Sequence, residues 1–180
     1  MSKKIVYFVI FLSLLTAFLF LSEKLWTPFN ILAIIYKEAS LGDLRKVSQS
    51  NVLLKKNAAD AFEKMAVTAL ADHVSLVPIS GFRSVSYQSN LFNRYIRIFG
   101  FSHTVRVLKK PGESEHHTGL ALDINDGFNP ACLLESCFEN TAAFEWLNKN
   151  AAIFGFYLSY PRSNSENIDF EPWHWLFQEK

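Results

Sequence analysis

The sequence predicts a single domain that mixes α-helices with β-strands, preceded by a hydrophobic N-terminal segment. Residues 54–71 place apolar side chains at helical spacing, whereas residues 120–125 alternate apolar and polar side chains as a strand does. Residues 5–21 are uncharged and almost entirely apolar. A chain of 180 residues has room for one domain and such an extension.

The N-terminal segment has the properties of a membrane-spanning helix. Its apolar run can cross most of a bilayer, which takes about 17–25 residues, and it has no polar face. Lys3 and Lys4 precede it, which favours a cytoplasmic N-terminus. A cleaved signal peptide needs small residues before the cut, and Phe18–Leu21 offers none. We therefore expect an uncleaved single-pass anchor, with a cleaved signal peptide as the alternative and an exported domain in both cases.

Three segments are expected along the chain. Residues 1–22 form the membrane anchor or signal segment, residues 23–50 a connector, and residues 51–180 the domain. The connector carries mixed signals, with short helices expected near Ile31–Ala39 and Leu41–Val47.

Charge and cysteine content limit the classes of function. The formal net charge is +1, so the chain lacks the basic footprint of a nucleic-acid-binding protein. Cys132 and Cys137 have four residues between them, which is not the CxxC spacing of a zinc knuckle or a thioredoxin-like site. An exported domain favours a local disulfide between them, and two free thiols are the alternative.

Apolar stripes predict the first two helices of the domain. Leu54–Ala71 has Asn57 as a possible N-cap, and its predicted core stripe is Ala58, Phe62, Met65 and Ala69. The second helix follows the turn Ser80–Ser84 and ends at Gly100, and its predicted buried stripe is Tyr87, Leu91, Tyr95 and Ile98.

The remaining elements are shorter. They are a strand at Val74–Ser80, a short strand at Val105–Leu108, a strand through Leu120–Asn125, a helix at Thr141–Phe154 that Gly155 caps, and strands at Phe156–Tyr160 and Trp173–Phe177. Residues 126–140 and 161–167 are expected to be loops.

Three residues form a candidate metal site. His116 lies in a predicted loop and Asp123 on the strand after it, and Gly119 between them lets the backbone bend so that the two side chains converge. His174 near the C-terminus adds a second imidazole. Two imidazoles and one carboxylate commonly hold a catalytic zinc with one coordination position open. Each residue alone would be an ordinary loop or ion-pair residue, but the joint pattern predicts a zinc peptidase.

Glu171 and Arg83 are candidate catalytic residues. Glu171 would be a spare carboxylate beside the metal, available to move protons. Pro172 disfavours the helix of an HExxH motif, and positions three apart on a strand face opposite sides. Glu171 must therefore reach the metal from the entrance of the last strand or from a loop. A cation at a helix start opposes the helix dipole, so Arg83 is either aimed at an anion or an ordinary surface or ion-paired arginine.

These residues fall in three blocks that together resemble the VanY-like zinc D-alanyl-D-alanine carboxypeptidases, relatives of lysostaphin-like peptidases and hedgehog signalling domains. The blocks are Ser80-Gly-Phe-Arg-Ser84 with Gln88, Ser114-x-His-x-x-Gly-x-Ala-x-Asp123, and Glu171-Pro-Trp-His174. Their order is that of the family, and the similarity extends from about Asn51 to the C-terminus.

The resemblance implies an α+β domain in which helices flank a small antiparallel sheet and zinc lies in a surface cleft. The implied zinc ligands are His116, Asp123 and His174, the implied general base is Glu171, and the implied substrate contacts are Arg83, Gln88 and Ser114. Arg83 would contact the carbonyl or carboxylate of the substrate.

The implied activity is removal of the terminal D-alanine from the stem peptide of peptidoglycan by a membrane-anchored enzyme. Ser159 stands where the family often has an arginine before Tyr160-Pro161, and no Thr-Gly precedes Glu171, so these cleft borders depart from the family pattern. An L,D-carboxypeptidase or a cell-wall endopeptidase would use the same chemistry. A non-catalytic zinc domain that binds wall peptides would lack Glu171, which is present.

Overall fold

The computed structural model describes residues 34–179. Its helices are α2 (Lys56–Ala71), α3 (Val85–Phe99), α4 (Phe101–Val107) and α5 (Ala142–Asn150), and its strands are β1 (Leu44–Lys46), β2 (Leu53–Lys55), β3 (Leu76–Ser80), β4 (Ala121–Asp126), β5 (Phe156–Leu158) and β6 (His174–Phe177). Short 3-10 helices connect them at Leu41–Asp43, Glu115–Thr118, Pro130–Cys132, Ser136–Asn140 and Ala151–Phe154.

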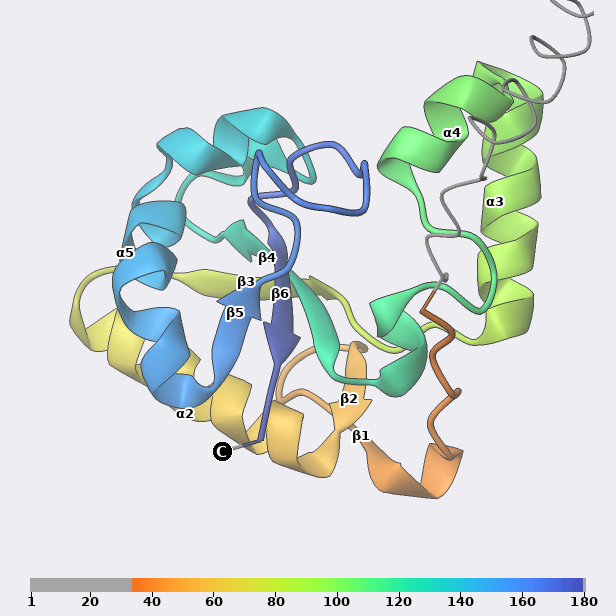
Figure 1. Cartoon of the computed structure of the whole chain (residues 1–180). Coiled ribbons are helices and arrows are strands. Elements are labelled where there is room, and N and C mark those ends of the chain that lie inside the picture. The colour runs from red at the N-terminus through yellow and green to blue at the C-terminus, as the bar shows by residue number, and fades with distance from the viewer. Residues whose placement is uncertain (1–33, 180) are drawn as a thin grey trace, which may run out of the picture. The chain divides into compact units, whose positions relative to one another are not determined.

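A four-stranded antiparallel sheet forms the centre of the domain, with strand order β3-β4-β6-β5. Strands β1 and β2 make a separate antiparallel pair. Figure 1 shows α2 and α5 on one side of the sheet and the α3–α4 pair on the other. The α+β class with a small antiparallel sheet is therefore confirmed.

The hydrophobic core lies between the sheet and the helices α2 and α5. The predicted α2 stripe of Ala58, Phe62, Met65 and Ala69 is fully buried in it. Leu122 and Ile124 of β4 point into the same core. Because side chains alternate along a strand, Asp123 between them points to the opposite face, towards α3.

Several local predictions were wrong. Residues 34–40 have no regular structure where a helix was expected, and residues 31–33 lie outside the described part. The expected helix at Leu41–Val47 is a 3-10 turn followed by β1, which pairs with β2. Lys55, the last residue of β2, occupies the N-cap position of α2 instead of Asn57. Val105–Leu108 is not a strand, since α4 extends to Val107.

The predicted membrane anchor at residues 1–22 lies outside the described residues. Within residues 34–179, no helix has both the length and the apolar character needed to cross a bilayer. Cys132 and Cys137 are joined by a disulfide, the pairing that an oxidising compartment preserves.

Candidate metal centre and cleft

The pairing of β4 with β6 brings two of the predicted ligands together. Asp123 lies directly opposite His174 in the register of the two strands, and Asp123 Oδ1 is 3.0 Å from His174 Nδ1. Directly opposite residues on an antiparallel pair hold their side chains on one face. The sheet therefore places these residues together, although they are 51 positions apart in sequence.

His116 reaches the same point from the 3-10 helix Glu115–Thr118, which precedes β4. Gly119 ends this helix with a left-handed backbone (φ 68°), and a side chain there would meet Leu44 at 2.7 Å. Glycine is the residue that adopts this conformation without strain. The predicted bend before β4 is confirmed.

The three side chains fit a zinc ion. One ligand atom from each of His116, Asp123 and His174 lies within 4.8 Å of the others, and all three residues are buried. His116 Nδ1 is 2.6 Å from the carbonyl oxygen of Gly81, which can only accept, so Nδ1 carries the hydrogen. The lone pair of His116 is then on Nε2, a buried atom without a hydrogen-bond partner among the described residues. An unpaired lone pair that faces a carboxylate and a second imidazole suits a metal.

The electrostatics of the cluster also suit metal binding. Burial, with the nearby charge of Arg83, lowers the pKa of His116 to about 4, so its imidazole is neutral as a ligand must be. Burial opposes ionisation of Asp123, but the hydrogen bond and the charge of His174 outweigh it and hold the pKa of Asp123 below its usual range. Burial likewise opposes the charge on His174, yet Asp123 and Glu115 raise the pKa of His174 to about 10. A metal therefore has to displace a proton from His174.

Glu115 is a buried carboxylate at the site that the sequence did not reveal. Its Oε2 is 2.8 Å from Nε2 of His174, the nitrogen on the far side of the ring from Asp123. Burial raises the pKa of Glu115, but the hydrogen bond from His174 outweighs this and lowers it. Carboxylates in this position fix the ring and the tautomer of metal-binding histidines. In the sequence, the position of Glu115 directly before His116 is the one sign that it belongs to the metal site.

Replacing Glu115 by glutamine is expected to weaken zinc binding about 10-fold, and Glu115→Ala up to about 100-fold, because His174 loses an anionic partner. Competition with a chromophoric chelator measures the dissociation constant without any substrate. Glu145→Gln, which changes an exposed carboxylate on α5, is the matched control. Wild-type zinc affinity in both Glu115 variants would show that Glu115 does not support His174.

Glu171 lies beside the cluster without belonging to it. Its Oε2 is 3.8 Å from His174 Nδ1, and it precedes the turn that leads into β6, as the sequence predicted. Burial raises the pKa of Glu171 to about 7, although the charge of His174 opposes the shift. A carboxyl group with such a pKa can both take up and release a proton near neutral pH.

Arg83 approaches the second carboxylate oxygen of Asp123, and its Nη2 is 4.0 Å from Asp123 Oδ2. Its Nε is buried and has no acceptor among the described residues, which suits a donor kept for a ligand. Its backbone is tied to the histidines: Arg83 N donates to His116 O at 3.1 Å, and Arg83 O pairs with Nδ1 of His117 at 2.7 Å. His117 thus fixes the Ser80–Ser84 turn and does not join the metal cluster.

An open cleft of about 620 Å³ surrounds the cluster, and Arg83, Gln88, Ser114 and Glu171 all line it. Gln88 is fully buried. Its Nε2 donates to Lys109 O, and its Oε1 has no hydrogen-bond partner among residues 34–179. Every predicted site residue therefore lies at this one cleft.

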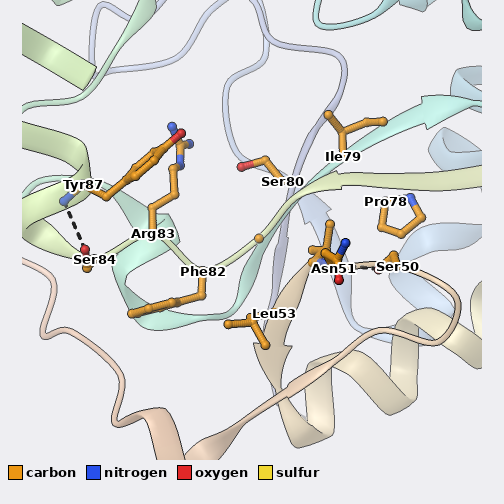
Figure 2. A pocket seen from close by; sticks show the side chains of 12 residues that line it. Ser50, Asn51, Leu53, Pro78, Ile79, Ser80, Phe82, Arg83, Ser84 and Tyr87 are labelled. Atoms are coloured by element: carbon orange, nitrogen blue, oxygen red, sulfur yellow. Dashed lines mark hydrogen bonds between the residues drawn. The ribbon is translucent and has the colours of Figure 1, made fainter. Parts of the chain in front are cut away.

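A second hollow of about 560 Å³ lies beside β3 (Figure 2) and shares Ser80, Arg83 and Tyr87 with the cleft. Ser84 caps α3 there by accepting a hydrogen bond from the backbone of Tyr87, drawn dashed in Figure 2. The cap holds the start of α3, and with it Arg83, at the boundary between the two hollows.

Comparison with known proteins gives consistent results. The putative carboxypeptidase YodJ of Bacillus subtilis (strain 168) is 33% identical over 169 residues, which cover 84% of this chain and 61% of YodJ. The chain thus spans less than two thirds of that relative. The solved LD-carboxypeptidase LdcB matches with a TM-score of 0.68 and 31% identity, over 79% of this chain and 69% of LdcB.

A further solved structure shares the fold. The vancomycin-resistance D,D-pentapeptidase VanY in complex with Zn(II) matches with a TM-score of 0.62 and 24% identity, over 74% of this chain and 77% of that one. The family model described as VanY, D-alanyl-D-alanine carboxypeptidase, matches residues 51–180, which hold all three motif blocks and the whole metal centre. The chain therefore belongs to the VanY D-alanyl-D-alanine carboxypeptidase family.

Proposed function

We propose that this protein is a zinc-dependent D-alanyl-D-alanine carboxypeptidase that removes the terminal D-alanine from peptidoglycan stem peptides. The convergence of His116, Asp123 and His174 in one cleft, with Glu171 beside them, carries this proposal. Membership of the VanY family supports the reaction class and the substrate class.

Each residue has a distinct proposed role. His116 Nε2, Asp123 and His174 Nδ1 would hold zinc, which when bound would polarise a carbonyl group and lower the pKa of water. Glu171 takes the proton of the attacking water and returns it to the leaving amine, a role that suits a carboxyl group whose pKa is raised by burial. Arg83 donates to the oxygen on which negative charge develops, and Gln88 and Ser114 bind substrate in the cleft.

We place the domain outside the cytoplasm, held to the cell membrane by residues 1–22 or secreted if that segment is cleaved. The Cys132–Cys137 disulfide supports an oxidising compartment. The apolar run at residues 5–21 supports the anchor.

An L,D-carboxypeptidase is the second candidate, since LdcB is described as an LD-carboxypeptidase and is 31% identical to this chain. Zinc and a base are common to both reactions, so the metal centre does not separate them. The chain departs from the family pattern at Ser159, which directly precedes Tyr160 of the cleft lining, so this part of the cleft is where a preference for one reaction would arise.

A substrate pair separates the candidates. The zinc-loaded full chain is mixed with a pentapeptide stem that ends in D-Ala-D-Ala and, separately, with the tetrapeptide that lacks the last residue. We expect loss of one residue from the pentapeptide only, detected by mass spectrometry. Cleavage of the tetrapeptide would establish the L,D reaction. If zinc is bound but neither peptide is cleaved, the proposed activity is wrong, and a cross-linked substrate or a binding function takes its place.

A further inference from the structure

Residues 34–40, which the sequence places in a connector, lie against the loop that carries the first metal-binding histidine. Tyr36 N donates a hydrogen bond to Gly112 O, and Ala39 N donates one to His117 O, both at 2.8 Å. The two acceptors lie on either side of that histidine in the sequence. This segment, which we call the strap, is therefore fixed to the metal-binding loop at two points.

A third contact ties the strap to the start of α3. Val85, the first residue of α3, donates its backbone N–H to Glu38 Oε2 at 2.6 Å. A carboxylate here accepts from an N–H that has no partner within the helix, and its charge complements the helix dipole. Because Arg83 lies two residues before Val85, the strap is anchored next to the arginine as well as at the metal-binding loop.

The side chain of Tyr36 reaches the carboxylate that supports the metal centre. The Tyr36 hydroxyl is 3.4 Å from Glu115 Oε1, whereas the other oxygen of this carboxylate, Oε2, is 2.8 Å from His174 Nε2. The hydroxyl of Ser159 is also near Glu115, but it is buried without a hydrogen-bond partner within residues 34–179. In the described part of the chain, Tyr36 is thus the donor to Oε1.

The phenol of Tyr36 is a permanent donor at neutral pH. Burial, together with the charges of Glu115 and Glu166, raises the pKa of Tyr36 to about 12. The hydroxyl therefore keeps its proton, and an ionised carboxylate can only accept. The hydrogen bond runs from Tyr36 to Glu115.

Two donors hold a carboxylate more firmly than one. With Oε2 alone engaged, the Glu115 side chain can still turn about its own bonds, whereas a second donor on Oε1 fixes the plane of the group. A fixed Oε2 accepts from Nε2–H of His174, which leaves the lone pair of the ring on Nδ1, the nitrogen that faces Asp123. That is the nitrogen that a metal in this cluster needs.

We propose that Tyr36 is a positioning residue of the metal centre, which acts through Glu115 to keep the ring of His174 oriented for a bound metal ion. This inference rests on the proposed function, because it assigns a supporting residue to the same zinc site. The family model begins at residue 51, so the strap lies outside the segment that carries the three motif blocks. The metal centre of this chain accordingly includes a residue from the segment before the matched domain.

The zinc affinity of the full chain tests this role. Tyr36→Phe removes the hydroxyl and keeps the ring. We expect it to weaken zinc binding about 2- to 10-fold, the range of one ordinary hydrogen bond, because the contact to Glu115 is long. Competition with a chromophoric chelator measures the dissociation constant without any substrate. Tyr157→Phe, which removes the hydroxyl of an exposed tyrosine on β5, is the matched control and should bind zinc as the wild type does.

A double-mutant cycle separates positioning from a general loss of stability. In a Glu115→Ala background, Tyr36→Phe should cost no further zinc affinity, because the acceptor of its hydrogen bond is gone. A general loss of stability would instead weaken zinc binding in both backgrounds.

Two results would overturn the role of Tyr36 while leaving the proposed function intact. One is wild-type zinc affinity in Tyr36→Phe. The other is an equal loss of affinity with and without the Glu115 side chain. If the wild-type protein itself binds no zinc, the proposed function fails together with this inference.

Discussion

Replacing Glu171 by glutamine is expected to lower kcat by about 10²–10⁴-fold while zinc stays bound. Glutamine has nearly the same shape but cannot accept the proton of the attacking water. Zinc should be retained because Glu171 is not one of the three converging ligands, and its nearest oxygen is 3.8 Å from His174 Nδ1. Steady-state kinetics with the pentapeptide and chelator competition on the same sample measure the two properties separately.

The pH profile provides an independent control for this role. In the wild type, kcat/KM should fall as the pH falls through the pKa of Glu171, because the protonated carboxyl cannot act as a base. Burial raises that pKa to about 7 in the metal-free protein, and the charge of a bound zinc ion lowers it, so kcat/KM should fall at a pH below 7. Glu171→Gln should abolish this acidic fall in kcat/KM. If the variant instead loses zinc, Glu171 is a ligand and the proposed role is wrong.

The sequence predicted the metal cluster because its residue types and spacing are unusual in combination. His116, Asp123 and His174 each have an ordinary explanation alone, and only their joint pattern indicated zinc. The alternation of residues 120–125 also indicates that Asp123 points away from Leu122 and Ile124, and the structure has these two residues in the core and Asp123 at the metal cluster. What spacing could not supply is the register of β4 against β6, which sets Asp123 opposite His174.

The residues that support the cluster were harder to predict, because their partners are distant in sequence. From the sequence alone Glu115 has the properties of a solvated charge in a loop, but in the fold β6 places His174 2.8 Å from its carboxylate. From the sequence alone Gln88 has the properties of a surface residue of α3, but in the fold the segment after α4 supplies the carbonyl oxygen of Lys109 as its acceptor. Such contacts depend on tertiary packing, which local patterns do not encode.

The mispredicted elements have the same origin. Val105–Leu108 has the apolar, branched composition of a strand, but Gly100 starts a helix there, and Thr104 is buried with its hydroxyl on Gly100 O at 2.7 Å. Residues 44–46 become a strand because β2 lies beside them. The α3 stripe has correct helical spacing, yet Tyr87, Leu91 and Tyr95 line the cleft and Ile98 is exposed. Periodicity therefore predicted the helix but not what covers its apolar face.

Replacing Asp123 by alanine is expected to weaken zinc binding by about 10²–10³-fold. Structural zinc sites with four ligands bind with about 10–16 kcal/mol, or about 2.5–4 kcal/mol for each ligand. Competition with a chelator measures the loss, and activity should fall with it and return only at high zinc concentration. Asp43→Asn, which changes an exposed carboxylate far from the cluster in sequence, is the control. Wild-type zinc affinity in Asp123→Ala would contradict the assigned ligand set.

The same substitution should also destabilise the protein without zinc, by up to about 3–5 kcal/mol, because it removes one of the two buried carboxylates that pair with His174 and leaves Glu115 to pair with it alone. Asp123 helps to raise the pKa of His174 to about 10 in the folded protein. A raised histidine pKa stabilises the fold fully below the unfolded pKa of about 6.5 and loses that contribution as the pH rises through the folded value. The destabilisation by Asp123→Ala should therefore be largest near pH 6 and shrink towards pH 10, as denaturant unfolding of the metal-free proteins can measure. A destabilisation that does not change with pH would mean that Asp123 stabilises the fold by packing and not through the charge of His174.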